Sequence, residues 1–296
     1  MTGDAVSTTY NPTPSSLVAC NDLIVASDWR VALEQAGMTS LNALFEMPGE
    51  LLGKPGLDDW RQRLRVTLAR DGAVETLYLK RFRRPPARAL RAVRGSGTGA
   101  SSVAGVEWEW MRRLASEAIP CPKPVALGQQ LSNGREVRSA VLSAAVPGDA
   151  LERQMLRLRQ QNRPRLRGLL KPTADLVARL HQCGYIHRDL YLSHLFHDPD
   201  SPVEQSLHLI DLQRVFTPRW RKMRWKTKDL ASLNYSTPSD AVSNTDRVRW
   251  LKHYLGVSKL DADAKRLLRG TAAKTRRIAR HDRRRRARLG LEEGHR

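Results

Sequence analysis

The sequence is poor in cysteine: Cys20, Cys121 and Cys183 are the only three in 296 residues. None belongs to a CxxC pair or to a Cys/His spacing typical of zinc ligands, so we expect neither a disulfide framework nor a structural zinc site. No apolar run approaches the roughly eighteen residues that indicate a transmembrane helix. The first residues lack a basic segment followed by an apolar one, so we expect no secretory signal and a cytoplasmic location.

Acidic residues are also scarce, with 30 Asp and Glu against 51 Lys and Arg, which gives a net charge of +21. A charge of this size concerns partners rather than fold, and it fits nucleic acid, an anionic membrane surface or an acidic or phosphorylated substrate. The chain contains no RRM, KH or zinc-finger pattern, so we expect no specific nucleic-acid partner. With 41% hydrophobic residues it can build a core, in one large domain or in two lobes around a cleft.

The densest group of reactive side chains lies in residues 184–196, where a glycine break and a short apolar piece precede the loop His187-Arg188-Asp189. A second apolar stretch, 207–212, contains Asp211 at the end of a predicted strand. A loop carboxylate followed about twenty residues later by a strand-end carboxylate is typical of the protein-kinase fold. There the first acid meets the attacking hydroxyl and the second holds Mg²⁺ on the ATP phosphates. The alternative is structural, with both acids serving only as cap or turn residues.

Upstream, residues 63–69 and 75–82 alternate between polar and apolar on either side of an Asp-Gly turn, which predicts antiparallel strands. Lys80 on the second strand fits the lysine that contacts the α- and β-phosphates; the alternative is an exposed lysine on a basic strand. A predicted helix over 107–114 would supply a glutamate to hold that lysine. Glu107 is the first candidate, and Glu109 is the reserve.

Composition divides the chain into four predicted parts. They are a poorly ordered N-terminus (1–21), an N-terminal extension with the sheet lobe (22–142), a helical lobe with the catalytic loop and the metal-binding strand end (143–260), and a basic helical tail (261–296). A buried strand over 138–146 is predicted to lead into the hinge between the lobes, where adenine would dock on backbone groups.

Three basic segments leave alternatives open. The arginine-rich connection 81–105 fits either an anionic substrate site or a solvated loop, and its Gly/Ser part is more typical of a flexible linker than of a phosphate cradle. The Trp-bearing run 219–226 fits membrane-surface contact, nucleic-acid stacking, or tryptophans packed inward beneath a basic face. The tail 265–288 fits attraction to anionic lipid, at about 1 kcal/mol per basic residue near the surface, or RNA binding, or a solvated helix.

Taken together, Lys80, Glu107, the His187-Arg188-Asp189 loop and Asp211 occur in kinase order. The chain resembles the lipopolysaccharide kinase (Kdo/WaaP) family over roughly residues 22–255, most specifically in 184–214. The resemblance implies an α+β, bilobal protein-kinase-like fold with a small antiparallel-sheet N-lobe and a mainly helical C-lobe. It also implies phosphoryl transfer from ATP, with Mg²⁺, to a hydroxyl of a lipopolysaccharide inner-core sugar, Kdo or heptose. The acceptor would be an anionic glycolipid at the cytoplasmic membrane face, met through peripheral contact of the basic surface.

The predicted site comprises catalytic Asp189, His187 and Arg188, cofactor-binding Lys80, Glu107 and His194, and metal-binding Asp211 and His194. In this set Asp189 accepts the proton of the hydroxyl, and Arg188 supports the loop. His194 stands where general protein kinases carry asparagine, and an imidazole prefers softer ions than Mg²⁺. We therefore expect Asp211 to hold one Mg²⁺ firmly and His194 to be a weaker or water-mediated partner. The glycine-rich loop over ATP is degenerate here, so phosphate binding should depend more on Lys80 and the metal.

Two other hypotheses remain open. The chain could be a protein kinase or a small-molecule phosphotransferase of the aminoglycoside type, with the same fold. It could also be a basic pseudokinase that binds anionic membrane or RNA through its arginines. Retention of Lys80, Asp189 and Asp211 together argues against lost catalysis.

Overall fold

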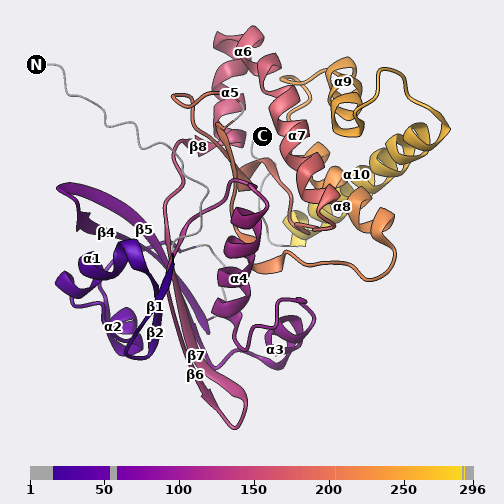
Figure 1. Ribbon diagram of the computed structural model, residues 1–296. Coiled ribbons are helices and arrows are strands. Elements are labelled where there is room, and N and C mark those ends of the chain that lie inside the picture. The colour runs from indigo at the N-terminus through magenta and orange to yellow at the C-terminus, as the bar shows by residue number, and fades with distance from the viewer. Residues whose placement is uncertain (1–15, 54–58, 204, 289, 291–296) are drawn as a thin grey trace, which may run out of the picture.

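The computed structural model describes residues 16–53, 59–203, 205–288 and 290. An antiparallel sheet forms an N-terminal lobe, and a group of helices forms a C-terminal lobe (Figure 1). This is the predicted α+β arrangement. No helix in the described ranges combines the length and the apolar character that crossing a membrane requires.

The large sheet contains seven strands in the order β1-β2-β6-β7-β5-β4-β3. The strands are β1 (Leu17–Cys20), β2 (Leu23–Ala26), β3 (Glu50–Leu51), β4 (Arg61–Arg70), β5 (Ala73–Arg83), β6 (Pro124–Ser132) and β7 (Arg135–Ala144). The predicted Asp71-Gly72 turn joins β4 to β5, with φ of 51° and 79° at these two residues. Positive φ at both central residues is what a two-residue hairpin turn of this kind requires.

The N-terminal extension completes one edge of this sheet. Residues 1–15 of the stretch predicted to be poorly ordered lie outside the described residues, but Leu17–Cys20 forms β1, contrary to that prediction. The strand is stable because it pairs with β2, which itself pairs with β6. The short helices α1 (Arg30–Gln35) and α2 (Leu41–Glu46) cover one face of the sheet (Figure 1).

The opposite face of the sheet carries α4 (Val103–Ser116), which contains the predicted 107–114 helix and lies between the sheet and the C-lobe (Figure 1). Its N-terminus is capped twice: the Ser102 hydroxyl accepts from the amide of Gly105 at 3.0 Å, and a Glu136 carboxylate oxygen accepts from the amide of Val103 at 2.8 Å. Both caps satisfy amides that a helix leaves open. These bonds fix the helix that carries Glu107.

The 81–105 connection is more ordered than predicted. It contains α3 (Ala87–Arg94), whose Val93 is buried. The Gly/Ser part, expected to be a flexible linker, is fixed because Arg113 of α4 donates to the carbonyls of Gly97 and Thr98 at 2.9 and 2.8 Å. The buried hydroxyls of Ser96 and Thr98 lie 2.7 Å apart and bond to each other, so they are not turned outward as a phosphate cradle.

The chain enters the helical lobe through Gly148, where φ is +80° and an added Cβ would lie 2.1 Å from the His197 carbonyl oxygen. Only glycine fits this approach. The lobe consists of α5 (Leu151–Gln161), α6 (Arg163–Gly168), α7 (Leu170–Gln182), α8 (Lys222–Ser236), α9 (Asn244–Leu255) and α10 (Ala262–Arg288), with a small sheet of β8 (Asp149–Ala150), β9 (Leu195–His197) and β10 (Leu207–Leu209) in the order β10-β9-β8.

The basic helix α10 packs along α8 (Figure 1). Asn234 donates to the Thr275 hydroxyl at 3.0 Å, and the Tyr235 hydroxyl donates to Asp282 at 2.6 Å. One side of this helix is therefore committed to the C-lobe as far as Asp282, while most of its arginines remain exposed on the other sides.

Candidate active site

Lys80, Glu107 and Asp211 meet where the two lobes face each other. The Lys80 ammonium lies 2.6 Å from a Glu107 carboxylate oxygen and 3.1 Å from Asp211 Oδ1. The three side chains come from β5, from α4 and from the residues after β10, and α4 also contacts the Leu212–Arg214 turn. The structure thus brings together the lysine and the two acids that the sequence placed in kinase order. Glu109, the reserve candidate, pairs instead with Arg112.

The electrostatics of this group favour the charged forms of Lys80 and Asp211. Burial alone would lower the pKa of Lys80, but the attraction of Glu107 and Asp211 outweighs it, so the pKa is raised. The pKa of Asp211 lies well below its usual range because Lys80 attracts its ionised form more strongly than burial disfavours it. Arg63 stands opposite Lys80 in the β4–β5 ladder and adds a second cation to this field.

Asp211 takes a left-handed backbone conformation, with φ of 60° and ψ of 61°. Aspartate tolerates this region better than most non-glycine residues. The conformation ends β10, whose three residues are all buried, and begins the 3-10 turn Leu212–Arg214. The chain therefore changes direction sharply at the backbone of Asp211, just after the strand ends.

His194 connects Asp211 to the catalytic loop. Its Nδ1 donates to the Asp189 carbonyl oxygen at 2.7 Å, and its Nε2 lies 3.7 Å from Asp211 Oδ2. A backbone hydrogen bond makes the same connection: the amide of Ile210 donates to the His194 carbonyl oxygen at 3.0 Å. The loop of Asp189 and the strand end of Asp211 are thus held side by side through one residue.

His187 supports the loop from beneath. It is fully buried, and its Nε2 donates to the Ile210 carbonyl oxygen at 3.0 Å. Burial lowers its pKa, so the ring is neutral. A fully buried ring cannot touch a substrate, so this geometry favours a positioning role for His187 over the predicted catalytic one.

Arg188 has a similar role. Its guanidinium carbon lies 5.4 Å from the Phe216 ring centre and 5.6 Å from that of Trp225, and those two rings contact each other edge to face. Its backbone is left-handed, with φ of 70°. Burial lowers its pKa despite the neighbouring acids. Arg188 therefore fixes the loop against the segment that follows Asp211, as its expected supporting role requires.

Asp189 has two cationic neighbours for which the sequence suggested no contact with it. Arg214 Nη1 lies 2.8 Å from Oδ1 and 2.7 Å from Oδ2 of this carboxylate. The Lys228 ammonium lies 4.0 Å from Oδ1 and donates to the Arg188 carbonyl oxygen. Burial lowers the pKa of Lys228, although Asp189 and Asp229 partly oppose this.

Asp229 is a third residue that sequence reasoning missed. It is fully buried on α8 and accepts from the backbone amide of His187 at 2.7 Å. Its Oδ2 also lies 3.4 Å from Nε2 of His181, whose Nδ1 accepts from the Tyr254 hydroxyl at 2.8 Å. The only signal in the sequence was an aspartate within a run otherwise suited to a buried helix face.

Within the described parts of the chain, no three His, Cys, Asp or Glu side chains lie close enough to hold a metal ion by themselves. Mg²⁺ is commonly bound in kinases by one or two carboxylates together with phosphate oxygens and water. His194 Nε2 lies 3.7 Å from Asp211 Oδ2. With a neutral ring, Nε2 would be an acceptor, and two acceptors at this distance suit a shared cation. The residues present therefore fit a Mg²⁺ ion that nucleotide phosphates help to hold.

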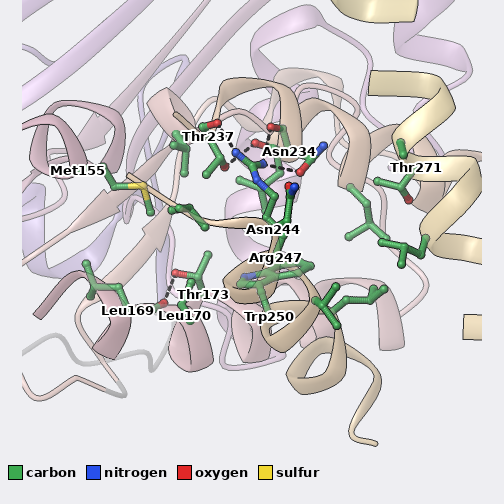
Figure 2. A pocket seen from close by; sticks show the side chains of 18 residues that line it. Met155, Leu169, Leu170, Thr173, Asn234, Thr237, Asn244, Arg247, Trp250 and Thr271 are labelled. Carbon is green, nitrogen blue, oxygen red and sulfur yellow. Dashed lines mark hydrogen bonds between the residues drawn. The ribbon is translucent and has the colours of Figure 1, made fainter. Parts of the chain in front are cut away.

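A separate cavity of about 320 Å³ lies within the helical lobe, away from this cluster. Most of its walls are apolar side chains from α5, α7, α8, α9 and α10, among them Met155, Leu170, Leu233, Leu251 and Leu268. Figure 2 shows the polar side of the cavity, where Arg247 donates to the carbonyl oxygens of Asn234 and Thr237 at 3.0 and 2.8 Å. The cavity contains none of the predicted site residues.

Comparison with known proteins gives a consistent result. The family model described as lipopolysaccharide kinase (Kdo/WaaP) matches residues 61–254. Lipopolysaccharide core heptose(I) kinase WaaP of Pseudomonas aeruginosa (strain PAO1) is 32% identical over 154 residues, which cover 50% of this chain and 58% of that protein. The protein of the same name from Escherichia coli K12 is 28% identical over 158 residues, which cover 51% and 59%. The chain therefore spans less than two thirds of the length of these relatives.

A solved structure, WaaP in complex with acyl carrier protein, resembles most of the chain. It covers 90% of this chain and 98% of that chain, with a TM-score of 0.62 and 24% sequence identity. At this identity the likeness shows the fold alone, and it confirms the kinase-like, two-lobed architecture that the sequence predicted.

Proposed function

Because the chain belongs to the lipopolysaccharide kinase (Kdo/WaaP) family, we propose that it transfers the γ-phosphate of ATP to a hydroxyl of a lipopolysaccharide core sugar, with heptose as the acceptor. The observation that carries this proposal is the ion-pair group of Lys80, Glu107 and Asp211, joined through His194 to the loop of Asp189. The heptose choice follows the names of the curated relatives. Kdo is the alternative acceptor.

In this mechanism Asp189 orients the acceptor hydroxyl and takes its proton as the phosphoryl group arrives. Lys80 neutralises charge on the α- and β-phosphates, and Glu107 holds it in place at 2.6 Å. Asp211 and His194 would hold Mg²⁺, which supplies charge neutralisation on the β- and γ-phosphate oxygens when bound. Most of the rate acceleration then comes from placement and from preorganised charge rather than from covalent chemistry.

The acceptor can be tested directly with the full chain. Labelled phosphate from Mg²⁺-ATP should pass to extracted core lipid that lacks heptose phosphate, and not to a generic protein substrate. Asp211→Ala should lose the thermal stabilisation that Mg²⁺-ATP gives the parent protein. Transfer to protein in preference to core lipid would favour the protein-kinase alternative, and no stabilisation of the parent by Mg²⁺-ATP would favour a pseudokinase.

We further propose that the protein works at the cytoplasmic membrane face, where a lipid-linked core sugar is accessible from the ATP-containing side. The net charge of +21 supports this location, because a basic surface is attracted to anionic lipid. Sedimentation with anionic and with neutral vesicles at matched salt separates this from charge-independent association.

A second candidate function is partnership with an acyl carrier protein, the partner named for the solved WaaP structure. The apolar cavity of the helical lobe favours it, because a fatty acyl chain needs a dry slot with apolar walls. A carrier protein loaded with a long acyl chain should raise the melting temperature more than the unloaded carrier does. Ala272→Leu, which adds bulk to the α10 wall of the cavity, should abolish that difference; an equal effect of both carrier forms would exclude the acyl slot.

A further inference from the structure

The segment after Asp211 presents an unusual surface beside the proposed catalytic base. Residues 219–224, with the sequence Arg-Trp-Arg-Lys-Met-Arg, are all exposed, and we call them the anchor segment. Trp220 is 79% exposed and Met223 is 61% exposed. Two large apolar side chains exposed to this degree three positions apart in the chain indicate a surface that is covered by another phase or partner.

The residues on both sides of the anchor segment contact the catalytic loop or each other, whereas Trp220 between them is exposed. Before it, Phe216 forms an antiparallel bridge with Ile186 through amide–carbonyl bonds of 3.0 and 3.1 Å. After it, Trp225 packs against Phe216 with ring centres 5.0 Å apart, and both rings lie beside Arg188 of the catalytic loop. The two tryptophans thus differ: Trp225 packs inward and Trp220 points outward.

The charge of the surrounding chain indicates an anionic partner. Between Asp211 and Asp229 there are seven Lys and Arg and no Asp or Glu. Tryptophan and an aliphatic side chain flanked by cations suit the boundary between phospholipid headgroups and acyl chains. Nucleic acid would match the charge and could stack on the indole, but it offers no apolar phase for the methionine.

We propose that the anchor segment inserts into the headgroup layer of an anionic phospholipid bilayer and holds the Asp189 loop at that surface. The inference rests on the proposed lipid-linked acceptor, and it names the surface that would bring the acceptor to the site. Arg214 and Lys228, the two cations that flank Asp189, lie on either side of the anchor segment in the chain. Membrane docking and access to the catalytic base are therefore coupled through one short stretch.

Vesicle sedimentation of the full chain tests the anchor without ATP or acceptor. The parent should bind vesicles of phosphatidylglycerol and phosphatidylethanolamine, and the double variant Trp220→Ser with Met223→Gln should bind about tenfold to hundredfold less. A second variant, Arg219→Gln with Lys222→Gln, should bind these vesicles about tenfold to thirtyfold less at low salt. Val31→Ser is the matched control, because Val31 is 63% exposed on α1, and it should bind as the parent does.

Equal vesicle binding by the parent and the Trp220/Met223 variant would overturn the anchor. So would a Trp220/Met223 variant that loses binding to an RNA oligonucleotide but binds vesicles as the parent does. A phosphorylation assay distinguishes a failure of the membrane anchor from a failure of the proposed kinase function. With a water-soluble core oligosaccharide as acceptor, the Trp220/Met223 variant should match the parent, because the anchor acts only on membrane acceptors. If the parent binds vesicles through the anchor but phosphorylates no core acceptor, the anchor stands and the proposed function fails.

Discussion

Replacing Asp229 with alanine is expected to weaken the catalytic loop from beneath, although this side chain is fully buried on α8. The carboxylate accepts from the His187 amide at 2.7 Å, two residues before Asp189. A hydrogen bond to a charged group contributes about 1.5–3 kcal/mol, and a buried amide left without its acceptor costs about 1–3 kcal/mol. The same removal leaves the His181 ring without its acidic partner.

These two energies describe the same hydrogen bond and partly overlap, so they are not summed in full. We expect Asp229→Ala to lower the free energy of unfolding by about 2–4 kcal/mol. Loop displacement should lower kcat about tenfold to hundredfold, because small misplacements of a base are costly. Asp229→Asn is the matched control: it keeps an oxygen that can accept from the His187 amide and should lose about 1 kcal/mol.

Urea unfolding and steady-state turnover measure both effects on the same preparations. The Mg²⁺-ATP thermal shift should persist in Asp229→Ala wherever the variant is folded, because Lys80 and Asp211 bind each other directly. Support of the catalytic loop by Asp229 is refuted if Asp229→Ala unfolds at the parent's urea midpoint. It is also refuted if the alanine and asparagine variants turn over at the same rate as the parent.

Three further predictions concern single groups. Arg214→Ala should lower kcat at least tenfold with nucleotide affinity unchanged, because Arg214 contacts Asp189 at 2.7 Å; Arg214→Lys should restore part of it in the same turnover assay. Burial lowers the pKa of His208 from 6.5 to about 4, so the unfolded chain binds its proton first and stability should fall by about 3 kcal/mol as pH drops from 6.5 to 4. The free energy of unfolding of His208→Gln, measured by urea titration at each pH, should change less over that range than the parent's. An equal change in both proteins would contradict the burial effect. The lowered pKa of Asp211 contributes stability that is present above the unfolded value of about 3.9 and is lost below it as the folded group protonates. Lys80→Met should shrink this contribution in acid titrations, and an unchanged acid transition would contradict the pairing.

Much of the site was readable because it depends on local patterns. The alternation of polar and apolar residues placed Lys80 on a strand, and the helical pattern placed Glu107 on a helix. The His-Arg-Asp loop and the apolar strand end pointed to Asp189 and Asp211. The structure brings Lys80, Glu107 and Asp211 into contact and connects the loop of Asp189 to them through His194, while their roles in catalysis stay predictions. A motif does not reveal burial, so nothing in the sequence indicated that the ring of His187 is fully buried.

The residues that the sequence missed depend on contacts between distant segments. Arg214 meets Asp189 across 25 positions, and Asp229 meets the His187 amide across 42. No spacing rule connects such pairs before the helical lobe is assembled. Strand β1 was missed for a related reason: a four-residue edge strand is stable only after β2 has joined β6.

The basic run 219–226 shows the limit of composition most clearly. Inward packing and surface contact were both open for its tryptophans, and the structure assigns one to each: Trp225 packs on Phe216, while Trp220 is 79% exposed. The two differ by five positions in a stretch that turns from loop to helix, so no single periodicity describes both.

The central claim is that Lys80, Asp189 and Asp211 form one site for phosphoryl transfer from ATP. Single-turnover transfer from labelled Mg²⁺-ATP to heptose-bearing core lipid, compared between the parent and Asp189→Asn, tests it most directly. We predict that the variant keeps the parent's Mg²⁺-ATP affinity within about twofold, while its transfer rate falls about 10²–10⁴-fold, the contribution expected of a general base. Transfer at the parent's rate by Asp189→Asn would contradict the claim.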